Sequence, residues 1–225
     1  APNLYKEGHK VQTPWLFQFL KNPEQLRYTT VLRMPRFNMD DDEAQQLANY
    51  FAAVDAVEYP YQKIGPQDSE VQHLKSLVYN AKYPHTGMNY LTASWRALNL
   101  DQKCVTCHAV GGNVVTGTDP TKVTRAPNLN RVEARLRPDW VDLWIYEPHW
   151  LTPYTVMPVN FASDQTSTKT LFDGNNVRLS QAVVDALFNY TKLMEIHGPT
   201  LYKPTDTAPP EEQAATDAAT DSGAN

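Results

Sequence analysis

The chain has 225 residues, 41% of them hydrophobic, which is enough to bury a core in one or two domains. Acidic residues outnumber basic ones by five, and the stretch 204–225 alone accounts for this excess, so the rest of the chain lacks the basic surface that nucleic acids require. The sequence contains no run of 18 apolar residues, the length that a bilayer-spanning helix needs. It has only two cysteines, three positions apart, which excludes a disulfide framework.

The N-terminal part predicts two helices separated by an irregular segment that contains Met34-Pro35. Thr13 is suited to cap the first helix, with Pro14 in the first turn, and the helix ends before Pro23, because proline is tolerated at a helix start and stops a helix elsewhere. Asp40 and Glu43 are spaced as a capping box that begins the second helix. The apolar residues of the two helices recur at helical spacing: Trp15, Leu16, Phe19 and Leu20, then Leu47, Tyr50, Phe51 and Val54.

A linker and two further helices lead into the cysteines. Tyr59 to Gly65 is rich in aromatic residues and proline and is predicted to be the linker. Ser69 is suited to cap the next helix, and Tyr90 to Leu98 is predicted to be another. The apolar residues of the helix that begins near Ser69 are Val71, Leu74, Leu77 and Val78.

The C-terminal part predicts one helix between Pro138 and Pro148 and a longer one that begins at Ser180. The Pro, Ala, Thr and Asp bias after residue 203 predicts a disordered tail. Few segments have the alternating pattern of strands, so the expected fold class is all-α. The expected organisation is a partial module over 1–58, a linker and helix over 59–85, a domain over 86–203 and the acidic tail over 204–225.

An internal repeat relates the two ends of this pattern. Residues 1–4, Ala-Pro-Asn-Leu, recur as residues 126–129. When residues 1–23 are aligned with residues 126–148 without a gap, six of the 23 positions are identical. Further matches keep the same order: Trp15 with Trp140, Pro23 with Pro148, Met34-Pro35 with Met157-Pro158, and residues 47–50 with residues 187–190. A repeat of this kind indicates two copies of one structural unit.

Cys104-Val-Thr-Cys107-His108 is the attachment signature of haem c, because two thiols at this spacing can add to the haem vinyl groups while the next histidine binds the iron. A zinc site would need a second pair of ligands, and the sequence has no further cysteine to supply it. A thioredoxin-like redox pair would need alternating strands and helices, which the pattern does not predict. A chance occurrence in a structural helix is the third alternative.

Met157 stands 49 residues after His108, between Pro153 and Pro158 in a polar loop. A methionine thioether fills the sixth coordination position of haem iron and raises its reduction potential, which favours electron transfer over oxygen chemistry. The alternative is that Met157 packs in a core, as most methionines do. Its place in a prolyl loop favours the ligand role.

The segment from Tyr90 to Met194, about half of the chain, resembles a class I c-type cytochrome. The resemblance implies helices around one covalent haem c, with His108 and Met157 as axial ligands. It also implies electron transfer as the function and the periplasm or another oxidising extracytoplasmic space as the location. The features that carry it are Cys104-Val-Thr-Cys107-His108, Ala126-Pro127-Asn128-Leu129, Trp140, Pro153-Tyr154-Thr155-Val156-Met157-Pro158 and Asn189-Tyr190.

The same resemblance implies roles for residues around the haem. The backbone carbonyl of Pro127 would orient the ring of His108, which fixes the tautomer of a ligand histidine. Trp140 and Thr155 match positions that pack on haem or bind a propionate, and Tyr154 joins them in the expected haem-binding set; the alternative is ordinary core and loop structure. Cations for a propionate are available just before Trp140, at Arg125, Arg131, Arg135 and Arg137.

Residues 1–58 resemble the back half of the same cytochrome domain, with Met34 in the place of the sixth ligand and no cysteines. Three explanations are open: a lost N-terminal segment with another haem, a partner chain that supplies that segment, or a haemless docking module. The retained Met34-Pro35 and the spacing of the two helices that carry Trp15 and Trp140 favour the first two. Met34 is therefore a candidate ligand of a second haem iron.

The sequence as a whole predicts an electron carrier or electron-transfer subunit, with redox proteins as partners, in an assembly of two haems or several subunits. One rival is a peroxidase-like haem enzyme, which would need an open coordination position on the iron. Another is a haem-bearing structural subunit of a larger oxidoreductase. The role of an insertion from Phe161 to Leu179 is open.

Overall fold

The computed structural model describes residues 4–24, 26, 34–99, 104–105, 107–110, 126–161 and 171–198. Over these residues the chain is helical without a strand, which confirms the all-α class. None of the described helices is both long and apolar enough to cross a membrane. The predicted acidic tail and residues 162–170 of the insertion lie outside the described residues.

The first module contains the helices α1 (Glu7–Lys10), α2 (Thr13–Lys21) and α3 (Asp41–Val54). The predicted capping box of α3 is present, because the Asp40 side chain accepts from the backbone N–H of Glu43 and the Glu43 side chain accepts from that of Asp40. The polypeptide before α2 supplies no side-chain cap, and the predicted cap Thr13 is instead a buried first residue of the helix.

The core of this module depends on small residues. Gly8 of α1 lies directly on the backbone of α3, and the buried face of α3 consists of Ala44, Ala48 and Ala52. The apolar residues that the sequence grouped on α3 are therefore only partly buried: Leu47 and Phe51 pack against the core, whereas Tyr50 is 60% and Val54 is 63% exposed.

Replacing Gly8 with alanine is expected to destabilise the protein by about 2 kcal/mol, because overpacking of a tight contact forces the backbone apart. A Cβ at this position would lie 2.1 Å from the carbonyl oxygen of Phe51. Urea unfolding followed by circular dichroism measures the effect. Gly65→Ala is the matched control, since a Cβ there meets nothing within 4 Å; equal stability of the two variants would contradict this packing.

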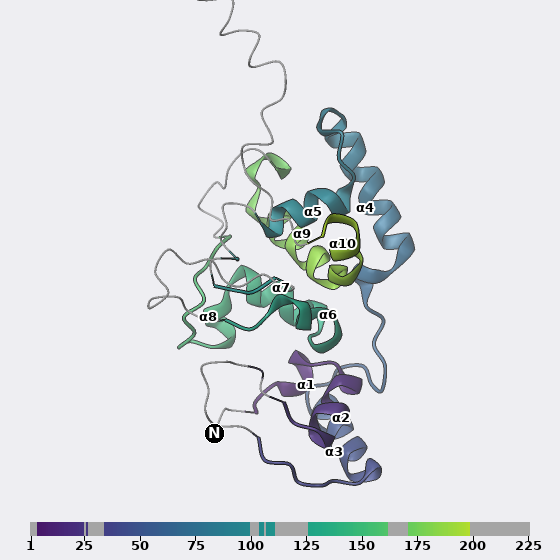
Figure 1. Ribbon diagram of the computed structural model, residues 1–225, viewed down its shortest axis with the longest axis vertical. Coiled ribbons are helices and arrows are strands. Elements are labelled where there is room, and N and C mark those ends of the chain that lie inside the picture. Colours follow the sequence, from purple (N-terminus) through teal and green to yellow (C-terminus); the bar gives the residue numbers. More distant parts are fainter. Residues whose placement is uncertain are drawn as a thin grey trace, which may run out of the picture.

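The rest of the described chain forms one larger helical unit (Figure 1). Its longer helices are α4 (Ser69–Lys82), α5 (Tyr90–Leu98), α7 (Pro138–Tyr146), α9 (Asn176–Phe188) and α10 (Tyr190–His197), and its short ones are α6 (Val132–Arg135), α8 (Pro148–Leu151) and the 3₁₀ turns Gly65–Gln67, Pro84–Thr86, Leu129–Arg131 and Phe172–Gly174.

Two helices are capped by residues that lie upstream of the predicted ones. Asp68, not Ser69, caps α4, since its carboxylate accepts from the backbone N–H groups of Glu70 and Val71. Asn175 caps α9, so this helix begins four residues before Ser180, which is buried inside it. The last four residues of the predicted insertion are therefore helical.

The core of this unit is formed where α5 crosses α9 and where aromatic rings gather beside them. Tyr79 of α4 and Tyr83, which directly follows this helix, pack with Tyr90 and Phe172, with ring centroids 5.0–6.1 Å apart. Because these tyrosines turn one face of α4 inward, the apolar residues predicted for that helix do not all reach the core. Leu74, Leu77 and Val78 lie on the solvent side, 53–69% exposed.

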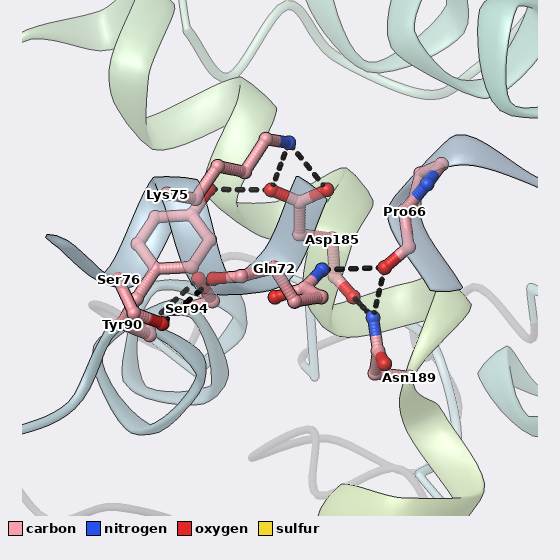
Figure 2. A network of polar contacts seen from close by, with 8 residues as sticks. All are labelled: Pro66, Gln72, Lys75, Ser76, Tyr90, Ser94, Asp185 and Asn189. Atoms are coloured by element: carbon pink, nitrogen blue, oxygen red, sulfur yellow. Dashed lines mark hydrogen bonds and ion pairs between the residues drawn. The ribbon is translucent and has the colours of Figure 1, made fainter. Parts of the chain in front are cut away.

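A buried polar network joins α4 and α5 to α9 (Figure 2). Asp185 of α9 is 1% exposed, and its carboxylate oxygens lie 2.6 and 2.8 Å from Lys75 Nζ. The Tyr90 hydroxyl donates to the same carboxylate, and burial raises the pKa of Tyr90, so the phenol remains a donor. The Asn189 side chain donates to the carbonyl oxygen of Pro66 at 2.8 Å, and this hydrogen bond holds the segment before α4 against the end of α9.

The internal repeat is present in the structure. The helices α1 and α6 are both four residues long and begin 125 positions apart, at residues 7 and 132. The helices α2 and α7 are both nine residues long and have the same offset, at residues 13 and 138. The matched segments 7–21 and 132–146 therefore form helices of equal length at one offset, which agrees with the sequence repeat.

The two copies contact each other through equivalent residues. Val11 and Leu136, which occupy the same place in each copy, form an antiparallel bridge. The Gln12 N–H donates to the Arg135 carbonyl oxygen at 2.8 Å, and the Arg137 N–H donates to the Lys10 carbonyl oxygen at 3.0 Å. Exchanging the copies leaves this pattern unchanged, which is the property of an isologous contact around a local twofold axis.

Side-chain contacts between the two copies are also reciprocal. Gln12 Nε2 donates to the carbonyl oxygen of Leu136 at 2.7 Å, and Arg137 Nε donates to that of Val11 at 2.9 Å. The cation of each copy lies over the tryptophan of the other: Lys10 Nζ is 5.9 Å from the ring centre of Trp140, and the Arg135 guanidinium is 5.0 Å from that of Trp15.

Candidate functional site

The two cysteines and His108 lie in one turn that follows α5 in the chain. The N–H of Cys107 donates to the carbonyl oxygen of Cys104 at 3.2 Å, and the N–H of His108 donates to the same oxygen at 2.9 Å. Neither cysteine is in a disulfide, both are half-buried, and Val105 between them is buried. The turn thus brings two thiols and an imidazole together within five consecutive positions.

His108 is held by the first residues of the second copy. Its Nδ1 lies 2.7 Å from the carbonyl oxygen of Pro127, the contact that the resemblance implies for these residues. A parallel bridge joins His108 to Ala126, and the N–H of Leu129 donates to the carbonyl oxygen of Ala109 at 3.0 Å. The Ala-Pro-Asn-Leu segment therefore serves to fix the histidine.

The contact with Pro127 defines which ring nitrogen of His108 can bind a metal. A carbonyl oxygen only accepts hydrogen bonds, so Nδ1 must carry the proton. In the neutral ring, Nε2 then has the free lone pair. Burial lowers the pKa of His108, while the hydrogen bond to Pro127 partly opposes this effect. The ring is therefore kept in its neutral, ligating form near pH 7.

Met157 lies in an extended loop after α8. The N–H of Thr155 donates to the carbonyl oxygen of Thr152 at 3.0 Å, and the Thr155 hydroxyl accepts from the N–H of Met157 at 3.2 Å. Thr155 thus shapes the backbone around Met157. Met157 itself is half-buried, whereas its neighbours Tyr154 and Val156 are 80% and 83% exposed.

Trp140 belongs to the core of the larger unit and is 9% exposed. Its ring stacks on Trp144, with centroids 4.9 Å apart, and Lys10 of the first module covers it. The same core contains Val105, Val110 and Phe161, and Cys104 packs against it. The attachment turn and Trp140 therefore border one apolar interior.

The arginines predicted near a propionate have other partners where the structure describes them. Arg131 pairs with Glu24, and Arg135 lies over Trp15. Arg137 is 2% exposed and donates to Val11, Thr13, Gln62 and Glu58; burial lowers its pKa. Arg125 lies outside the described residues.

Sequence reasoning missed that Arg135 and Arg137 belong to the contact between the copies. The signal that could have indicated this was their equivalence to Lys10 and Gln12 at the repeat offset. Polar residues at the same two positions of both copies are what an interface through equivalent residues requires.

Comparison of the chain with models of known protein families, with curated proteins and with solved structures found no match.

Proposed function

We propose that this chain transfers single electrons through a covalently attached haem c in a class I cytochrome c-like domain. Cys104 and Cys107 would form the thioethers, and His108 and Met157 would be the axial ligands. When bound, the haem supplies an iron that alternates between ferrous and ferric states. The observation that carries the proposal is the 2.7 Å contact of His108 Nδ1 with Pro127, because it leaves the lone pair of Nε2 available to an iron, directly after two cysteines that are not in a disulfide.

The other described residues support this role. The donor set of two thiols, an imidazole nitrogen and a thioether is the set that holds a six-coordinate haem c. Val105, Val110 and Phe161 keep the interior beside the attachment turn apolar, which restricts water and tunes the reduction potential. Thr155 orients the loop of Met157, and Pro127 fixes the tautomer of His108.

The setting of the protein is part of the proposal. Covalent haem attachment of this kind implies a periplasmic or other extracytoplasmic location, and redox proteins are the expected partners. The two copies in contact favour an assembly of two haems or several subunits over a self-contained carrier.

A pyridine haemochrome assay on the natural assembly tests the proposal. We expect haem c to be attached to this polypeptide and expect slow binding of carbon monoxide by the ferrous protein, because Met157 occupies the sixth position. A polypeptide without covalent haem would contradict the proposal. Rapid carbon monoxide binding by the resting ferrous protein would indicate the peroxidase-like alternative instead.

A further inference from the structure

One face of α3 in the first module is exposed to solvent although it carries large apolar residues. Tyr50 is 60% and Val54 is 63% exposed, and Gln46 and Ala53 are exposed beside them. These positions follow helical spacing, so they share one face. The opposite face, with Ala44, Ala48 and Ala52, is buried in the module.

The equivalent face in the second copy is covered by α5. Tyr190, the counterpart of Tyr50, is 4% exposed, and its ring meets that of Trp95 edge to face at 5.7 Å. Leu193, the counterpart of Ala53, is 1% exposed. The internal repeat therefore indicates what belongs on this face of α3, namely a helix like α5 that leads into a haem-attachment turn.

The first module retains the other features of the second copy. Met34 and Trp15, the counterparts of Met157 and Trp140, both pack against the core of the first module. The exchange of contacts between equivalent residues holds this core against the second copy. A methionine, a tryptophan and an uncovered helix face thus stand together in one module.

We propose that the exposed face of α3 binds an α5-like helix of another polypeptide segment that carries its own Cys-x-x-Cys-His haem, and that Met34 binds the iron of that haem. This inference rests on the proposed function of the second copy. The local twofold axis then relates two haem c sites, one complete on this chain and one completed by the partner segment.

A haem peptide of residues 90–108, acetylated at its N-terminus, is a direct probe because it contains the α5 sequence, the attached haem and no methionine. The target is the full-length haem-loaded chain with Met157→Ala, whose own iron has lost its methionine. We expect the ferric haem peptide to become low-spin and to gain the far-red absorbance band of methionine ligation when it binds.

Two variants in the Met157→Ala background test the assignment. Met34→Ala should abolish the band, and Tyr50→Asp should weaken binding about tenfold or more, since buried aromatic anchors dominate such contacts. Tyr61→Asp is the matched control, because Tyr61 is 80% exposed in the linker. It should change neither the methionine band nor the affinity for the haem peptide.

The outcomes separate this inference from the proposed function. If the chain carries its own haem and Met157→Ala removes its methionine band, but the haem peptide does not bind, the inference is overturned and the proposed function stands. A methionine band that persists without Met34 also overturns the inference. A chain without covalent haem would contradict the proposed function before any peptide is added.

Discussion

Replacing Cys104 and Cys107 together with alanine is expected to leave a protein with no covalently attached haem, so that acidified solvent extracts all haem from it. The reason is chemical, since each thioether to a haem vinyl group needs one cysteine sulfur and the chain has no cysteine besides these two. Intact mass under denaturing conditions measures the loss directly. The change should be complete rather than partial, because no second attachment site stands in this sequence.

The matched control for the cysteine variant is Met157→Ala, which should keep the mass of one attached haem because the thioether bonds do not involve the sixth ligand. Cys104→Ala and Cys107→Ala alone should each leave one thioether. If the wild-type chain carried zinc in place of haem, or if the double variant kept its haem under denaturing conditions, the attachment role of these cysteines would be wrong.

Much of the helical pattern could be predicted because its signals are local. The α5 helix begins and ends at the predicted residues, Tyr90 and Leu98, and the capping box of Asp40 and Glu43 is present. Ser69 was wrong as the cap of α4, and Ser180 was wrong as the start of α9, because Asp68 and Asn175 offer equally good acceptors upstream. A sequence rule that recognises a cap does not decide between neighbouring caps.

Which face of a helix is buried depends on partners far away in the sequence. On α4, the apolar spacing of Leu74, Leu77 and Val78 is helical, yet these side chains are exposed because Tyr79 and Tyr83 pack with Phe172. Periodicity identifies a stripe but not its partner.

Within the candidate site, the motif residues and the role of Pro127 came from the sequence and its resemblance. The contacts of Trp140 could not be predicted from the sequence, because Lys10 reaches its ring from the first module across the contact between the copies. A substitution in the first module can therefore affect the surroundings of the candidate haem site. This coupling follows from the exchange of equivalent residues and has no signal in the attachment motif itself.

Met157→Ala is expected to lower the reduction potential of the haem on the order of 0.1 V, a fraction of the roughly 0.8 V range that axial ligands span. A thioether favours the ferrous state, so its loss stabilises the ferric state. The variant should also lose the far-red band of methionine ligation and bind carbon monoxide rapidly, because the sixth position is open. Potentiometric titration and stopped-flow mixing with carbon monoxide measure these changes.

Met194→Ala is the control that separates ligation from packing, since Met194 is half-buried against the core of the same unit. It should reduce stability without shifting the potential or the spectrum. Met157→His should restore slow carbon monoxide binding, because imidazole also fills the sixth position, while the potential stays below that of the wild type. If Met157→Ala and Met194→Ala behaved alike in all three measurements, Met157 would be a packing residue. The iron would then have an open position, and enzyme chemistry would be the better account of this chain.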